Sequence, residues 1–133
     1  MEIKIVKTVN PKEKPEEDSL IFGVEFTDYM FEMDYTEGIG WHDAVIKPYG
    51  PIEIMPSAMV LHYAQEVFEG LKAYKTPSGE VQLFRPDENF KRMNRSNARM
   101  CIPFFIRFSQ HCVINFRVIK LLPCLFVLLF VKK

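Results

Sequence analysis

The most regular pattern of apolar and polar positions in this 133-residue chain follows a Pro-Ser pair at residues 56–57. Apolar side chains recur there with the spacing i, i+3, i+4, i+7 and i+8, at Val60, Tyr63, Ala64, Val67 and Phe68. This spacing is typical of an amphipathic helix, and Glu66 and Glu69 fall on its polar side. The Pro-Ser pair suits a helix start, and Gly70 suits the left-handed residue that follows a helix. The pattern therefore predicts a helix over residues 57–69.

The pattern changes after Gly70, where apolar and polar residues alternate on both sides of a TPSG sequence. Alternation is typical of strands, and Pro and Gly suit a tight connection, so we predict a β-hairpin over residues 71–84. A second predicted helix opens at Arg85 and Pro86 and ends near Met100. Its predicted inner face is formed by Phe90, Met93, Asn97 and Met100. Its basic face is formed by Arg92, Arg95 and Arg99, for which a solvated surface is the simplest interpretation.

The upstream half of the chain predicts short strands. An aromatic-rich segment with partial alternation predicts a strand over residues 25–35, followed by a turn at residues 37–40. Residues 41–43 are predicted to form a loop, and short strands are predicted at residues 44–50 and 51–55. A further short edge strand is suggested by Ile3, Ile5 and Val9. Strands and helices mix without a regular βαβ alternation, so the predicted fold class is α+β, with antiparallel strands and two main helices.

Composition and charge narrow the classes of function. The chain is 48% hydrophobic and 26% charged, which is ordinary for a globular protein, and its 17 basic and 17 acidic residues cancel. A net charge of zero gives no electrostatic footprint for nucleic acid. Three cysteines without paired spacing argue against a disulfide framework or a metal site, and they favour a reducing compartment such as the cytoplasm. The N-terminus lacks the apolar core of a signal peptide, so no export signal is expected.

Several short motifs occur in an order that resembles one enzyme family. They are LHY, FEGLKAY, LFRP, NFKRMNRS and RMCIP, preceded by FGVEFTDYMFEMDY and GWHDAVIKPYGPIEIMPSAMVLHY. This order resembles the branched-chain amino-acid aminotransferases, which are pyridoxal-phosphate enzymes of fold type IV. The resemblance covers residues 20–103 and implies the small N-terminal domain of such an enzyme. Residues 1–19 are then a solvated, mobile lead-in, and residues 104–133 are a tail that is not native to the family.

The resemblance implies a role for four residues. Arg92 matches the position that holds the phosphate of pyridoxal 5'-phosphate, and a planar guanidinium suits this role because it donates paired, charge-assisted hydrogen bonds. Phe22, Tyr63 and Phe68 match positions that line the pocket for the side chains of leucine, isoleucine and valine. Apolar walls are what recognise a branched aliphatic group. Helical periodicity alone would instead place Tyr63 and Phe68 in the core.

The Schiff-base lysine of the family has no counterpart in this chain. In the family that lysine lies in the large domain, beyond the position that matches Pro103. Lys72 and Lys75 lie on a predicted strand and are interpreted as solvated. His42 and His62 have no cysteine or carboxylate at metal-ligand or nucleophile spacing, so no metal site and no catalytic residue is predicted.

The implied function is transfer of the amino group of a branched-chain amino acid to 2-oxoglutarate. The implied partners are small amino acids and 2-oxo acids, with a homodimer for the intact enzyme and neither nucleic acid nor a membrane span. The chain by itself is expected to be inactive. Two alternatives stay open: another fold type IV enzyme, such as a D-amino-acid aminotransferase or an aminodeoxychorismate lyase, and a truncated domain that at most dimerises.

The tail, residues 104–133, differs in composition from the rest of the chain. It has no Asp, Glu, Gly or Ala and holds six of the 12 Phe residues. Its apolar run over residues 121–131 is shorter than the roughly 20 residues that span a bilayer. An interfacial basic helix is disfavoured by Pro123 and by the β-branched and aromatic residues. We favour the hypothesis that a frameshift or premature join replaced a family-like continuation.

Overall fold

The computed structural model describes residues 2–13, 15, 16, 19, 21, 23–105 and 125–130. Its internal contacts divide the chain into two compact units, Met1–Glu53 and Ile54–Lys133. Short strands, mostly antiparallel, combine with two helices, which confirms the α+β class. The predicted limits of the lead-in, domain and tail stay predictions.

The first unit is a three-stranded sheet with the order β1-β3-β2. β2 (Tyr29–Thr36) and β3 (Gly40–Pro48) form an antiparallel hairpin, and β1 (Lys4–Ile5) pairs with β3 in parallel at the sheet edge. The hairpin turn requires glycine, because Gly38 and Gly40 have φ of 84° and 93°. At the closed end of the hairpin, the rings of Tyr35 and Trp41 meet edge to face with centroids 5.2 Å apart.

This sheet confirms some predictions for the upstream half and corrects others. The edge strand, the strand predicted at residues 25–35 and the turn at residues 37–40 are present, although β2 begins at Tyr29. The loop predicted at residues 41–43 is wrong, because all three residues belong to β3, and Trp41 and His42 pair with β2. The pairing is nevertheless irregular here, with a bulge between Glu32 and Asp34 and a φ of 52° at Asp43. Residues 51–55 form no strand.

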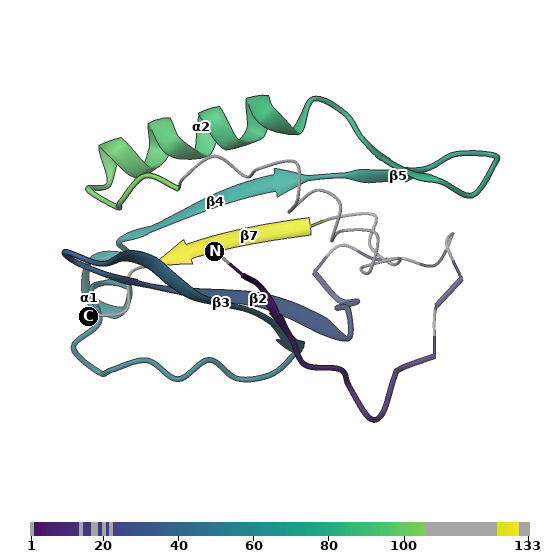
Figure 1. Cartoon of the computed structure of the whole chain (residues 1–133), viewed down its shortest axis with the longest axis horizontal. Coiled ribbons are helices and arrows are strands. Elements are labelled where there is room, and N and C mark those ends of the chain that lie inside the picture. Colours follow the sequence, from purple (N-terminus) through teal and green to yellow (C-terminus); the bar gives the residue numbers. More distant parts are fainter. Residues whose placement is uncertain are drawn as a thin grey trace. The chain divides into compact units, whose positions relative to one another are not determined.

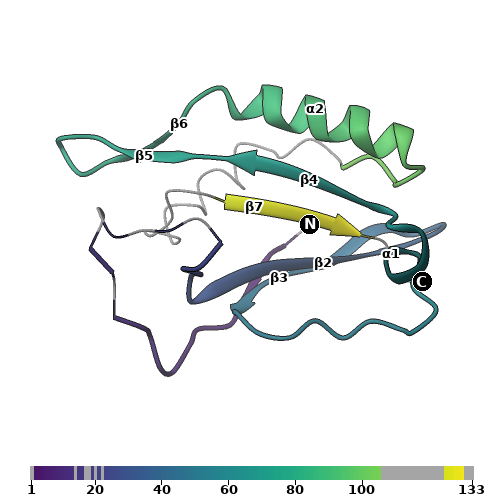
Figure 2. The same ribbon diagram turned by 180° about the vertical axis from the view of Figure 1, so that it is seen from behind.

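The second unit carries the remaining elements, which Figures 1 and 2 show from opposite sides. A one-turn helix, α1 (Met59–Tyr63), precedes β4 (Glu66–Leu71). β5 (Ala73–Lys75) and β6 (Val81–Leu83) form an antiparallel hairpin, which leads into α2 (Pro86–Arg99). β7 (Leu125–Phe130) pairs antiparallel with β4 along its whole length, with Glu66 opposite Phe130 and Leu71 opposite Leu125. Figures 1 and 2 agree that α2 runs along β4.

The helix predicted over residues 57–69 is wrong beyond its first turn. α1 ends at Tyr63 because Ala64 adopts the left-handed conformation, with φ 48° and ψ 41°. From Glu66 onward the backbone is extended and pairs with β7. Val67, Glu69 and Leu71 are buried on one face of the strand, whereas Glu66 and Phe68 are exposed. The strand gains a full backbone ladder and a buried face, which a short helix without a side-chain cap does not offer.

The hairpin and the second helix confirm the predictions for residues 71–100. Pro86 lies in the first turn of α2 with Asp87 and Glu88, where the acidic groups meet the positive end of the helix dipole. The predicted inner face is correct: Met93 and Asn97 are buried, and Phe90 and Met100 are half-buried. Beyond the helix, the Asn94 amide holds the backbone of Phe105 by two hydrogen bonds of 2.8 and 3.0 Å. The chain therefore folds back onto α2 just after Pro103.

The lead-in predicted at residues 1–19 is exposed wherever the structure describes it, apart from Ile3 and Thr8, which are half-buried. The backbone N–H of Lys12 donates to the Asp28 carboxylate over 3.1 Å, and that of Thr8 donates to the Tyr29 hydroxyl over 3.2 Å. Of the tail, residues 104, 105 and β7 lie within the described residues. None of the helices in the described ranges has the length and apolar character needed to cross a membrane.

Candidate active-site groove

The candidate site lies where α2 runs along the buried face of β4. Successive side chains of a strand point to opposite faces, so Glu69 shares a face with Val67 and Leu71. On α2, Asn89 and Arg92 are three positions apart and therefore lie on the same side of the helix. These two residues reach across to Glu69.

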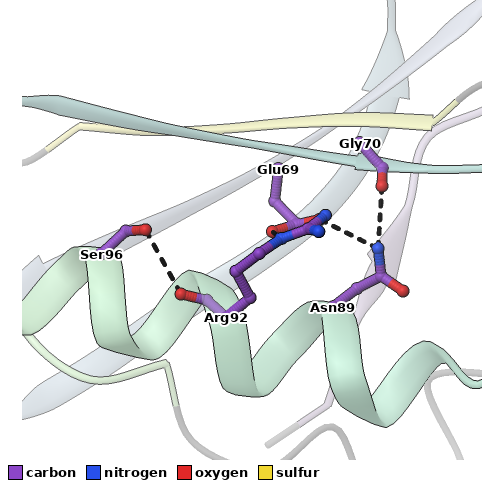
Figure 3. A network of polar contacts seen from close by, with 5 residues as sticks. All are labelled: Glu69, Gly70, Asn89, Arg92 and Ser96. Atoms are coloured by element: carbon purple, nitrogen blue, oxygen red, sulfur yellow. Dashed lines mark hydrogen bonds and ion pairs between the residues drawn. The ribbon is translucent and has the colours of Figure 1, made fainter.

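Figure 3 shows the resulting network. Arg92 donates from Nε to Glu69 Oε2 over 2.8 Å and from Nη2 to Glu69 Oε1. The Asn89 amide nitrogen donates to Glu69 Oε1 and to the carbonyl oxygen of Gly70, each over 2.9 Å. Glu69 is only 5% exposed. A carboxylate this deeply buried is stable only when it is paired and hydrogen-bonded, and here both of its oxygens have donors.

Glu69 and Arg92 each shift the pKa of the other. The hydrogen bond from Arg92 lowers the pKa of Glu69, and this effect exceeds the opposing effect of burial; Asn89, the positive charge of Arg92 and the Gly70 N–H lower the pKa further. Glu69 in turn raises the pKa of Arg92. Both groups are therefore charged near neutral pH.

Beside this pair lies an open groove of about 490 Å³ between β4 and the basic face of α2. Its walls are formed by Glu66, Val67, Phe68, Arg92, Arg95, Ser96, Arg99 and Met100. Three arginines line the groove, and with Glu66 in its wall and Glu69 paired to Arg92 the local balance is positive. The basic face of α2, which the sequence left as a solvated surface, therefore borders a concave site suited to anions.

The four residues singled out by the sequence have different positions. Arg92 and Phe68 both line the groove, so the structure brings these two together. Tyr63, at the end of α1, is 76% exposed and does not line the groove. Phe68 is 59% exposed, so the core positions that helical periodicity suggested for Tyr63 and Phe68 are wrong. Phe22 lies outside the described residues.

The groove leaves one edge of the Arg92 guanidinium open to an anion such as a phosphate group. The Arg92 guanidinium presents one edge, Nε and Nη2, to Glu69. Within the described part of the chain Nη1 makes no hydrogen bond, and the Arg92 side chain is 60% exposed. The second edge, Nη1 with the outer hydrogen of Nη2, therefore remains available to a phosphate, for which the fork geometry of arginine is suited.

The other polar residues weighed in the sequence have local roles. Lys72 and Lys75 are exposed on or beside β5. The imidazole of His62 bonds the Pro56 carbonyl oxygen over 2.7 Å, and that of His42 lies between Thr36 and Asp43 at 2.8 and 2.7 Å. Across the described ranges, no group of three or more His, Cys, Asp or Glu side chains could hold a metal ion.

Sequence reasoning missed Glu69. Helical periodicity placed it on a solvated polar face, whereas it is the buried centre of the network. The available signal was the alternation of Val67, Glu69 and Leu71, with a carboxylate at a buried strand position, which demands a cationic partner.

The chain that forms this arginine-lined groove is similar in sequence to known proteins. No protein-family model matches the chain. Curated relatives nevertheless include "Branched-chain-amino-acid transaminase 1" of Bacillus subtilis, 63% identical over 97 residues, which is 73% of this chain and 27% of the relative. A "Probable branched-chain-amino-acid aminotransferase" of Staphylococcus aureus is 59% identical over 101 residues, covering 76% and 28%.

A mitochondrial branched-chain-amino-acid aminotransferase of Saccharomyces cerevisiae is 48% identical over 103 residues, covering 77% of this chain and 26% of the relative. The resemblance to branched-chain aminotransferases that the motifs indicated is thus confirmed over about three quarters of this chain. The chain spans about a quarter of the length of these relatives.

Proposed function

We propose that this chain carries part of the cofactor site of a pyridoxal-phosphate-dependent branched-chain aminotransferase of fold type IV. The observation that carries the proposal is the exposed edge of Arg92 in a positive groove, within a chain whose relatives are named as branched-chain aminotransferases. Arg92 binds the cofactor phosphate by paired, charge-assisted hydrogen bonds. When bound, the cofactor supplies the electron sink for amino transfer.

Phe68 forms an apolar part of the wall of the same groove, in contrast to the charged arginines. In the proposed enzyme this wall contacts the aliphatic side chain of leucine, isoleucine or valine, with Tyr63 and Phe22 as further wall residues. The amino donor and a 2-oxo acid acceptor are the proposed partners, in a cytoplasmic homodimer. The combination of LHY and FEGLKAY, with RMCIP following, favours the branched-chain class over D-amino-acid aminotransferases and aminodeoxychorismate lyases.

The 133 residues by themselves are proposed to bind the cofactor phosphate without catalysing transamination. Neither Lys72 nor Lys75 matches the family's Schiff-base lysine, and neither lines the groove. Pyridoxal 5'-phosphate should therefore associate reversibly through its phosphate.

The test compares the binding of pyridoxal 5'-phosphate and pyridoxal to the chain by calorimetry. We expect measurable binding of the phosphorylated compound only. Arg92→Lys keeps the charge but removes the fork, and it should weaken this binding about tenfold.

Arg95→Lys is the matched control, because Arg95 lines the same groove on the same helix but has no hydrogen bond to Glu69. It should change the affinity less than about twofold. Equal binding of both compounds, or equal effects of the two substitutions, would remove Arg92 from the phosphate site.

A further inference from the structure

The buried carboxylate of Glu69 is a feature that the proposed function does not use. It lies on β4, which is fixed by pairing with β7 along all six residues from Glu66 to Leu71. Its two oxygens take three hydrogen bonds, two from Arg92 and one from Asn89. At 5% exposure, this carboxylate has little freedom to turn away from its donors.

Asn89 holds the carboxylate in place from the helix side. Its single amide nitrogen bridges Glu69 Oε1 and the Gly70 carbonyl oxygen, each over 2.9 Å. The amide is therefore tied to the strand backbone as well as to the carboxylate, as Figure 3 shows. The network links one helix to one strand through Asn89, Glu69 and Arg92.

The network fixes the orientation of the Arg92 guanidinium. A long exposed arginine normally samples several rotamers and loses side-chain entropy when a ligand fixes it. Here two hydrogen bonds to a buried carboxylate already fix the plane of the guanidinium, although the side chain is 60% exposed. The second edge of the guanidinium is then held in a single orientation. A phosphate can be bound there without further ordering of the arginine side chain.

We propose that Glu69, held by Asn89, is the positioning residue of Arg92 and orients its free edge for an incoming phosphate. This rests on the proposed function of Arg92 and adds a requirement to it, because affinity then depends on two residues that do not touch the phosphate. The competing interpretation is that Glu69 only balances charge. A carboxylate that only balances charge would have the same effect on phosphate affinity whether or not its side chain is long enough to make both hydrogen bonds to Arg92.

Two substitutions that keep every charge separate these interpretations. Glu69→Asp shortens the side chain by one methylene, so the carboxylate loses its two-point contact with Arg92. Asn89→Ala keeps Glu69 and Arg92 and removes the amide that holds the carboxylate. We expect pyridoxal 5'-phosphate to bind about tenfold more weakly to Glu69→Asp, and a few-fold more weakly to Asn89→Ala. Charge balancing alone predicts no change in either variant.

Glu66→Gln is the matched control. Glu66 is on the same strand and lines the groove, but it is exposed and its carboxylate makes no contact with Arg92. Because Glu66 lines the groove, removing its negative charge should raise the affinity, the opposite direction from Glu69→Asp. The unfolding midpoint of each variant identifies any that does not fold.

A second measurement does not depend on the ligand. Hydrogen exchange at the Arg92 Nε–H, followed by nitrogen-15 NMR, should be slow in the native chain and faster in Glu69→Asp. Fast exchange in the native chain would overturn the proposal, whatever the variants bind. Unchanged affinity in whichever of the two variants is folded would overturn it as well, and would leave the phosphate role of Arg92 intact. A native chain that binds no pyridoxal 5'-phosphate would refute the role of Arg92, and the positioning role with it.

Discussion

Adjacent residues of β4 have opposite surroundings because the strand turns each side chain to the other face. Glu69 is buried against α2, whereas Phe68, one position earlier, is 59% exposed and borders the groove. An aromatic ring in water and a carboxylate in the interior reverse the usual preference. On the buried side, hydrogen bonds from Arg92 and Asn89 stabilise the Glu69 carboxylate. On the exposed side, Phe68 leaves an apolar wall beside three arginines.

Substitutions at two positions of β4 test this assignment of faces. Phe68→Ala should lower the free energy of unfolding by less than about 1 kcal/mol, because the ring is mostly exposed. Leu71→Ala, at a position that is 6% exposed on the buried face, should cost about 2 to 5 kcal/mol. Urea unfolding of both variants measures the difference. A larger loss for Phe68→Ala than for Leu71→Ala would place Phe68 in the core and remove it from the groove.

At the scale of the element, one stretch of sequence satisfied two periodicities. Val60, Tyr63, Ala64, Val67 and Phe68 have helical spacing, while Val67, Glu69 and Leu71 alternate as a strand does. Periodicity alone favoured the helix, because a glutamate at a buried strand position counts against a strand. Only the partners, Arg92 on α2 and the backbone of β7, make the strand favourable. Both lie more than 20 residues downstream, beyond the reach of local pattern.

Elements whose signals are local were predictable. The β5–β6 hairpin depends on its own TPSG turn, where the Gly79 N–H donates to the Thr76 carbonyl oxygen over 2.8 Å. α2 depends on Pro86 and the acidic residues of its first turn, and on the stripe that buries Met93 and Asn97. Arg92 was found through its motif and not through its surroundings, since a solvated surface explained the basic stripe equally well. Its orienting carboxylate could not be found until β4 was known to be a strand.

Ala64 offers a test of where α1 ends. Its φ of 48° is a left-handed conformation that costs an alanine roughly 1 kcal/mol and costs a glycine almost nothing. Ala64→Gly should therefore raise the free energy of unfolding by up to about 1 kcal/mol. If residues 57–69 were one helix, the same substitution would lie in a helix interior and would lower it by about 1 kcal/mol.

The comparison for Ala64→Gly is Ala98→Gly, which lies inside α2 and should lose stability. Thermal unfolding of both variants in parallel shows whether each substitution raises or lowers the free energy of unfolding. Loss of stability in both would mean that α1 continues past Tyr63.

At the scale of the whole molecule, the tail supplies a strand to the part of the chain that resembles aminotransferases. About a quarter of the chain lies outside each of the matches to known relatives. β7 nevertheless pairs with β4 at all six positions, so a segment of atypical composition satisfies the backbone of the strand that carries Glu69 and Phe68. Strand pairing is a backbone interaction and tolerates many side chains, which is why an apolar segment of unusual composition can provide it. The frameshift hypothesis for residues 104–133 stays a prediction.

The dependence of the groove on β7 can be tested with a single proline. Val127 lies opposite Glu69 in the ladder, and Val127→Pro removes a backbone donor and distorts the strand at that point. Amide hydrogens of β4 should then exchange at least about tenfold faster, equivalent to about 1.4 kcal/mol of local stability. Val127→Thr, which keeps the N–H and a β-branched side chain, should leave exchange within about twofold of the native rate. Because Glu69 lies on β4, loosening this strand should also speed exchange at the Arg92 Nε–H and weaken the binding of pyridoxal 5'-phosphate. If β4 stays protected in Val127→Pro, the strand does not need β7, and the tail contributes nothing to the groove.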